Sequence, residues 1–171
     1  MMANLKLEAA TSENELAFRI IGRATFACCL TFREYARQLV SGKFNEIYLD
    51  LSQCTGMDST FMGVIAMICL ELRRSWPDKK LKVASASETN KKLLDEVGLS
   101  NFIEHIESFN QPMQWVQLFP CEDEQKPQVL TREDGQLILE AHKTLMGLSE
   151  ENVKKFDQVV KTIENDLENR S

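Results

Sequence analysis

No run of apolar residues in this 171-residue chain reaches the eighteen or so that a membrane-spanning helix needs. The first ten residues, MMANLKLEAA, lack a basic stretch followed by an apolar core, so we expect no secretion signal. The sequence also lacks the clusters of Lys and Arg that bind nucleic acids. These absences predict a cytoplasmic protein that does not span a membrane and does not bind DNA or RNA directly.

Cysteine and histidine are few and scattered. The five cysteines form no CxxC pair and no His-rich spacing, which argues against disulfides and zinc. Cys29 and Cys69 fall on apolar helical faces and are expected to be core residues, whereas Cys54 is the one candidate for a reactive thiol. His105 and His142 are far apart and form no metal-ligand motif. We expect His142, which lies among charged residues of a helix, to be solvated at the surface.

Sequence motifs of known catalytic sites are missing as well. The chain contains no GxSxG motif, no Walker motif and no glycine loop for dinucleotides. One acid adjoins a hydroxyl in a plausible site, Asp58 beside Ser59, and it is a poor general base without a histidine or a second partner. The sequence therefore predicts no catalytic residue, no metal and no cofactor.

Charge divides the chain into two unequal parts. Residues 1–119 hold 13 Lys and Arg against 14 Asp and Glu, whereas residues 120–171 hold 7 against 12. The segment PCEDEQKPQ is polar and acidic and contains two prolines, which is typical of a linker. We therefore predict a domain over residues 1–119, a linker over residues 120–128 and a helical hairpin over residues 129–171.

Apolar periodicity in the first part alternates between strands and helices. The predicted strands lie near residues 4–9, 16–21, 46–51, 81–85 and 102–106, with the first at a sheet edge. The predicted helices lie near residues 26–40 and 59–75, and a third is capped by Ser87 and ended by Gly98. This alternation favours an α/β sheet with parallel neighbours and right-handed crossovers.

The last part of the chain predicts two amphipathic helices in an antiparallel hairpin. The first covers residues 132–146 and ends at Gly147, and Ser149 can cap the second. Apolar residues recur at helical spacing in the second helix, at Val153, Phe156, Val160, Ile163 and Leu167. Such a hairpin is too short to be stable alone, so it must bury its apolar face elsewhere. The alternatives are the sheet of its own chain, a homodimer and a partner.

Residues 47–65, IYLDLSQCTGMDSTFMGVI, are the most informative about function. They predict a buried strand, a polar loop from Ser52 to Met57, and a helix opened by Asp58, Ser59 and Thr60. Side-chain oxygens at a helix start accept hydrogen bonds from unpaired backbone N–H groups, and this capping role is the ordinary one. An exposed hydroxyl in the positive field of a helix N-terminus is also well placed to carry a phosphate.

The same segment resembles the signature of STAS domains, and more narrowly that of bacterial anti-sigma factor antagonists. The resemblance rests on three short stretches, Asp50-Leu51-Ser52, Met57-Asp58-Ser59-Thr60 and Gly63-Val64-Ile65, and extends to about residue 109. It implies an α/β sandwich with a mixed four- to five-stranded sheet and helices mainly on one face, to which the two-helix hairpin is added.

The resemblance also implies a phosphorylation site. It implies that a partner kinase phosphorylates Ser59, with Thr60 as a second acceptor. The family often has Gly where this chain has Phe61, so we expect the bulky ring to affect which kinase is bound. The partner-binding residues that it implies are Asp50, Ser52, Met57, Asp58, Thr60 and Phe61.

The function that follows from the resemblance is a binding switch. The unphosphorylated protein would bind an anti-sigma factor Ser/Thr kinase, phosphorylation of Ser59 would release it, and a serine phosphatase would reset the cycle. A phosphate adds a charge of roughly −1.5 to −2, which Asp50 and Asp58 would repel. The alternatives are a STAS scaffold or sensory module without phosphate turnover, or a module that binds a small ligand or nucleotide; an enzyme ranks third.

Overall fold

The computed structural model describes residues 4–40, 44–109, 113–120 and 130–170. Its elements, in chain order, are β1 (Lys6–Thr11), β2 (Glu15–Ala24), the 3-10 helix η1 (Phe26–Cys28), α1 (Cys29–Val40), β3 (Glu46–Met57), α2 (Ser59–Ser75), β4 (Leu81–Ala84), α3 (Glu88–Glu96), β5 (Ile103–Ile106), β6 (Val116–Phe119), α4 (Arg132–Met146) and α5 (Glu150–Asn169). The predicted linker over residues 120–128 falls outside these residues, except for Pro120.

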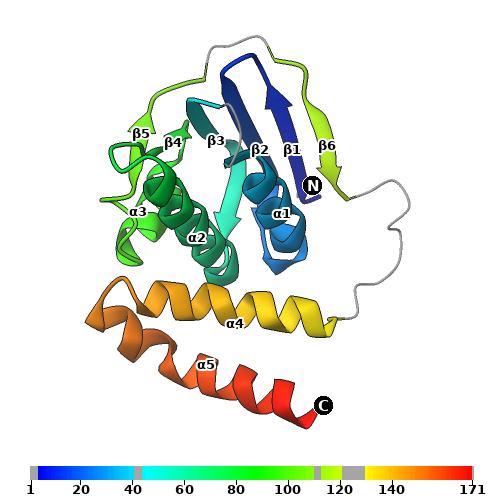
Figure 1. Ribbon diagram of the computed structural model, residues 1–171, viewed down its shortest axis with the longest axis vertical. Helices are drawn as coiled ribbons and strands as arrows, with labels where there is room; N and C mark the ends of the chain where they lie inside the picture. The colour runs from blue at the N-terminus through cyan, green and yellow to red at the C-terminus, as the bar shows by residue number, and fades with distance from the viewer. Residues whose placement is uncertain (1–3, 41–43, 110–112, 121–129, 171) are drawn as a thin grey trace.

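The described strands form one mixed sheet in the order β5-β4-β3-β2-β1-β6. Strands β2 to β5 are parallel, whereas β1 is antiparallel to both β2 and β6. Because successive right-handed crossovers proceed in one direction along the sheet, α1, α2 and α3 lie on the same face (Figure 1). The predicted fold class is confirmed, but β6 is an additional strand, and it makes β1 an interior strand instead of an edge.

Strand β3 is longer than the sequence predicts. Residues 52–57, expected to be a loop, continue the strand and pair with the second half of β2, through Gln53 with Ile21 and Met57 with Ala24. Two register shifts in this stretch accommodate its irregular pattern. The prediction of a loop is wrong because the pairing partner comes from a distant part of the chain, which local pattern does not reveal.

The core lies between the sheet and the helices. Alternate residues of β2 and β3 point toward the helices and are buried, among them Phe18 and Leu49. Phe32 of α1 contacts Phe18 edge to face at 5.0 Å and stacks on Phe61 of α2 at 5.3 Å. Each such buried ring stabilises the fold by ~1.5–3 kcal/mol.

The C-terminal hairpin forms as predicted, with helices at residues 132–146 and 150–169. Thr131 and Asp134 cap α4 reciprocally, and the Ser149 hydroxyl caps α5. In the structure the hairpin packs on the domain of its own chain. Helix α4 lies across the N-terminal end of α2, and α5 packs on the outer side of α4 (Figure 1). The hairpin meets the domain chiefly through the contact of α4 with α2.

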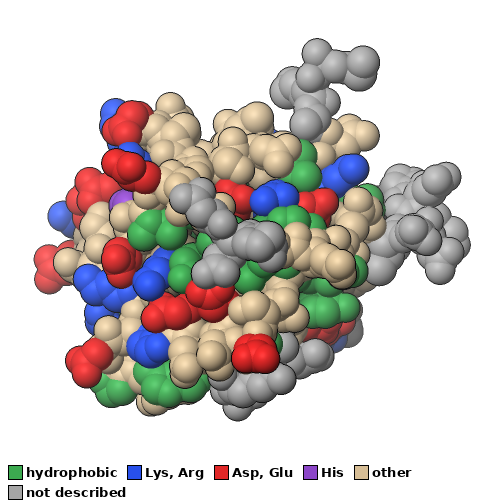
Figure 2. Space-filling model, turned by 90° about the horizontal axis from the view of Figure 1, so that it is seen from above, with side chains coloured by type: hydrophobic (Ala, Val, Ile, Leu, Met, Phe, Trp, Pro, Cys, Tyr) green, Lys and Arg blue, Asp and Glu red, His purple; other side chains and the backbone are tan. Residues whose placement is uncertain are grey.

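Charged side chains are mixed at the end of the molecule opposite the hairpin. Among the described residues visible there, acidic and basic groups alternate over the surface (Figure 2). Among the described residues, Lys82 pairs with Glu46 at 3.0 Å. Exposed pairs of this kind contribute little to stability, typically ~0–1 kcal/mol.

Candidate phosphorylation and docking site

Ser59 is the first residue of α2, directly after the long strand β3. Asp58 is the N-cap: its Oδ1 accepts a hydrogen bond from the N–H of Phe61 at 2.8 Å. Its Oδ2 accepts another from the N–H of Phe26, also at 2.8 Å, at the start of η1. The carboxylate of Asp58 thus fixes two chain segments at once, and it holds Ser59 at the helix start.

The Ser59 side chain is half-buried, and its hydroxyl contacts a histidine of the C-terminal hairpin. Oγ of Ser59 lies 2.9 Å from Nε2 of His142, while Nδ1 of His142 lies 2.8 Å from the carbonyl oxygen of Ile138. Because a carbonyl oxygen can only accept, Nδ1 carries the ring proton. Nε2 therefore accepts the hydrogen bond that the Ser59 hydroxyl donates. The sequence expectation of a solvated His142 is wrong, since only 4% of its surface is exposed.

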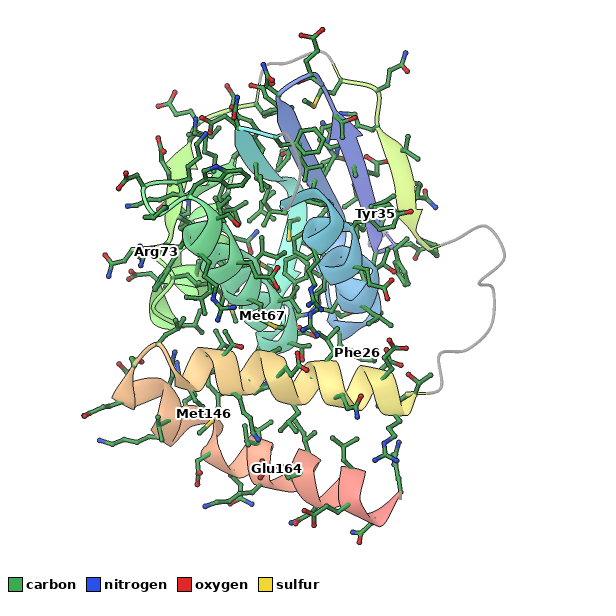
Figure 3. The ribbon with its side chains drawn as sticks, viewed as in Figure 1. Phe26, Tyr35, Met67, Arg73, Met146 and Glu164 are labelled. Carbon is green, nitrogen blue, oxygen red and sulfur yellow. The ribbon has the colours of Figure 1, made fainter. Side chains whose placement is uncertain are left out.

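Helix α4 covers the N-terminal half of α2 at very short range. A Cβ atom added to Gly63 would lie 2.5 Å from the carbonyl oxygen of Ala141, so this glycine permits the close approach of the two backbones. Arg33 of α1 reaches α4 as well, with its Nη2 2.6 Å from Oε2 of Glu140. In Figure 3, the labelled Phe26 and Met67 lie at the level where the domain meets α4.

The structure does not bring Asp50 to Ser59. Asp50 alternates with the core residues of β3 and therefore points to the sheet face opposite the helices. There Nε of Arg19 donates to its Oδ2 at 2.9 Å, and the N–H of Ser52 donates to its Oδ1 at 2.9 Å. The guanidinium of Arg19 in turn stacks on Trp115 at 3.9 Å. Asp50 is thus neutralised by Arg19, and of the two carboxylates expected to repel a phosphate only Asp58 adjoins Ser59.

The other predicted contact residues differ in exposure. Ser52 is exposed, whereas Met57 and Thr60 are buried at 4% and 6% exposure, which makes Thr60 a poorly accessible second acceptor. Phe61 is fully buried against Phe32. The expectation that its ring lies beside the acceptor at the partner surface is corrected by this packing: the ring fills the core, because the helix start turns its third residue toward the sheet.

Residues 6–111 match the family model of the STAS domain. The chain belongs to the STAS domain family. The match ends before β6 and the hairpin, so His142 and the rest of α4 and α5 lie outside the STAS domain as the family defines it. No curated protein matches the chain.

Solved structures share the fold of the STAS domain at low sequence identity. One is the unphosphorylated form of SpoIIAA, an anti-sigma factor antagonist of Bacillus, at 17% identity and a TM-score of 0.50; the match covers 60% of this chain and 88% of that one. Another is TM1081 of Thermotoga maritima, at 17% identity and a TM-score of 0.52, with 58% of this chain and 79% of that one covered. These likenesses establish the architecture of the STAS domain.

The buried thiols of the STAS domain are poorly suited to redox chemistry. Burial raises the pKa of Cys54, the one cysteine with a candidate reactive role, and its Sγ donates to the carbonyl oxygen of Gly56 at 3.3 Å. Burial likewise raises the pKa of Cys69 to about 12. Since the thiolate is the reactive form, both side chains are expected to be inert in the folded protein.

Metal sites and membrane-spanning helices can be assessed over the described residues. No group of three or more His, Cys, Asp or Glu side chains among them is arranged to hold a metal ion. Within the same residues, no helix is both long and apolar enough to cross a bilayer.

One feature of the sequence could have revealed the cover over α2. Its first half, from Thr60 to Ile68, is apolar on every side, and residues 60–66 are all buried in the structure. A helix that is apolar all round needs a neighbour on each side, and the sheet supplies only one. The pattern therefore indicated a second layer over α2, although it did not identify α4 as that layer.

Proposed function

We propose that this STAS protein is an anti-sigma factor antagonist whose binding to an anti-sigma factor kinase is switched by phosphorylation of Ser59. The observation that supports it best is the position of Ser59: a half-buried hydroxyl on the first residue of α2, adjacent to the N-cap Asp58. SpoIIAA, which shares the fold, is an anti-sigma factor antagonist with an unphosphorylated form.

The chemistry of the switch follows from charge. Unphosphorylated Ser59 has a neutral hydroxyl, which a partner surface can cover at low cost when it offers the hydroxyl a hydrogen bond. A phosphate would place roughly −1.5 to −2 charges next to the carboxylate of Asp58. Backbone N–H groups of the first turn of α2 favour an anion, so the domain would stay folded, whereas a partner fitted to the neutral form would face a desolvated dianion. A penalty of ~3 kcal/mol is enough to lower affinity about a hundredfold.

In the proposed cycle the unphosphorylated form binds the kinase, and a metal-dependent serine phosphatase restores that form after phosphorylation. Of the residues that the resemblance implies, Ser52, Asp58 and Ser59 are at least partly exposed, and Asp58 and Ser59 lie at the start of α2, where a partner can dock. Buried Met57, Thr60 and Phe61 would then act indirectly, by holding this surface in shape.

The proposal is tested first on protein purified from its source cells. Intact-mass spectrometry with peptide mapping should find a species heavier by about 80 Da, with the phosphate on the peptide that contains Ser59. With the anti-sigma factor kinase of the source organism, Ser59→Ala should bind without being released by ATP, and Ser59→Asp should bind about a hundredfold more weakly. Ser59→Thr, which keeps an acceptor hydroxyl, is the matched control. Full labelling of Ser59→Ala by the kinase would refute the assignment.

A second candidate function is a STAS interaction module without phosphate turnover. The hydrogen bond between the Ser59 hydroxyl and His142 favours this alternative. It gives the hydroxyl a structural role that requires no phosphorylation. Under this alternative the protein from source cells carries no phosphate on Ser59, and Ser59→Asp and Ser59→Ala change partner affinity by similar amounts.

A further inference from the structure

We infer that α4 occupies, within the same chain, the surface of α2 onto which the partner binds, so that the hairpin and the partner compete for it. This inference rests on the proposed function. In the closed form described here the start of α2 is covered by α4, and partner binding requires the hairpin to move away.

The first reason is that the contacts of α4 centre on the acceptor residue. His142 covers the Ser59 hydroxyl at 2.9 Å, and Ala141 lies against Gly63 one turn further along α2. A kinase active site must surround the hydroxyl that it phosphorylates, and a partner that senses that hydroxyl must contact it. Neither can share this space with α4, because at Gly63 even an added Cβ would lie 2.5 Å from the carbonyl oxygen of Ala141.

The second reason is that the hairpin is a separable unit. It lies outside the STAS match, and its second helix packs chiefly on its first. Within the hairpin, the ring of Phe156 of α5 lies 5.4 Å from the ring of His142, centroid to centroid, and Nζ of Lys143 of α4 lies 2.6 Å from Oε1 of Glu164 of α5. The hairpin therefore keeps much of its own packing when it leaves α2.

The third reason is that polar contacts attach the hairpin to the domain at two places, one on α1 and one at the end of α3. Glu140 pairs with Arg33 of α1 on one side. On the other, Nδ2 of the fully buried Asn152 donates to the carbonyl oxygen of Val97, at the end of α3, at 3.0 Å. Such contacts exchange readily for water when two surfaces part, since the net stabilisation from each is small.

The competition has a quantitative consequence. If the surface is available only in the open form, the apparent dissociation constant of the partner equals its intrinsic value divided by the open fraction. A substitution that weakens the hairpin contact should then raise the exposure of residue 59 and the partner affinity by the same factor.

Exposure can be measured on the full chain without any partner. Ser59→Cys places a thiol at the covered position, while Cys28, Cys29, Cys54 and Cys69 are buried; Cys121→Ser removes the remaining cysteine. In this background, Glu140→Lys should raise the rate of labelling by a disulfide reagent such as DTNB about fivefold to tenfold, since it replaces an ion pair with a repulsion.

A matched control is Glu168→Lys, the same charge change on an exposed position near the end of α5, which should leave the rate within twofold. Asn152→Ala tests the other side and should also raise the rate. If neither Glu140→Lys nor Asn152→Ala changes the labelling while both stay folded by circular dichroism, the hairpin does not open and the inference is overturned. If a variant fails to fold, the other decides.

The link to the partner is measured with the anti-sigma factor kinase of the source organism and chains that keep Ser59. Glu140→Lys and Asn152→Ala should each tighten binding by the factor found for labelling, and Glu168→Lys should not. Faster labelling with unchanged affinity would overturn the competition while leaving the proposed function intact. Faster labelling with no binding by any variant would refute the proposed function, and the competition with it.

Discussion

His142 is fixed on three sides. Its Nδ1 donates to the Ile138 carbonyl within α4, its Nε2 accepts from Ser59 of α2, and its ring packs edge to face on Phe156 of α5. A single imidazole ring thus joins three helices. The sequence suggested a solvated residue because its neighbours in the chain are charged, but the burial of His142 depends on helices that approach from elsewhere.

We predict that His142→Ala lowers the free energy of unfolding by ~2–3 kcal/mol, because it leaves a cavity between three helices and removes the partner of Ser59. Urea denaturation followed by circular dichroism measures the change. His105→Ala is the matched control: His105 is exposed on β5, and its loss should change the free energy by less than ~0.5 kcal/mol. Equal effects of the two substitutions would show that His142 is not buried in solution.

At the scale of elements, the contact of α2 with α4 depends on a position without a side chain. At Gly63 an added Cβ would lie 2.5 Å from a backbone oxygen of Ala141, which cannot swing aside. At Gly135 of α4, an added Cβ would lie 2.9 Å from Cδ2 of Leu167, the far end of a flexible side chain. A side chain can therefore be added at Gly135 at low cost, but not at Gly63.

We predict opposite effects of alanine at these two positions. Gly135→Ala should stabilise the protein by ~0.5–1 kcal/mol, because alanine is the better helix former and Leu167 can adjust. Gly63→Ala should destabilise it by ~1–3 kcal/mol, because the overpacking exceeds the gain in helix propensity. Both predictions are tested by comparing the thermal unfolding of each variant with that of the parent chain. A Gly63→Ala variant more stable than the parent would contradict the close packing of α4 on α2.

The elements themselves show what local pattern can and cannot predict. The helices over 59–75 and 132–146 have the predicted bounds, because caps and apolar periodicity lie within the segments themselves. The extension of β3 through residues 52–57 was missed, because it depends on pairing with β2. The four-residue strand 116–119 was missed for the same reason, since only its pairing with β1 distinguishes it from a loop.

The same division holds for the site. That Ser59 begins a helix could be predicted from Asp58 and the apolar run after it. Strand alternation predicts that Asp50 points away from the helices, whereas its pairing with Arg19 depends on β2 lying beside β3. That His142 covers Ser59 could not be predicted, because 83 positions separate them and their contact is made by a hairpin packing across another element.

At the scale of the whole molecule, the arrangement predicts two levels of stability. The buried core is one cluster that extends from β2, β3 and α2 to Leu137, Ala141, Leu145 and Phe156 of the hairpin, and the hairpin meets the domain chiefly through α4. Local openings that break few apolar contacts require less free energy than global unfolding. We therefore expect the hairpin to detach from the STAS domain in native conditions without unfolding it.

Native-state hydrogen exchange tests this expectation. Amides of α5 should exchange through an opening that costs a few kcal/mol less than the exchange of β2 and β3 amides, which report global unfolding, typically ~5–15 kcal/mol. Asn152→Ala should lower the opening free energy of α5 by ~1–3 kcal/mol, because it removes donors to the carbonyls of Val97 and Leu145. If hairpin and strands exchange at one common free energy in the parent chain, then α4 and α5 are an integral part of the domain core, and the surface at Ser59 is uncovered only when the whole protein unfolds.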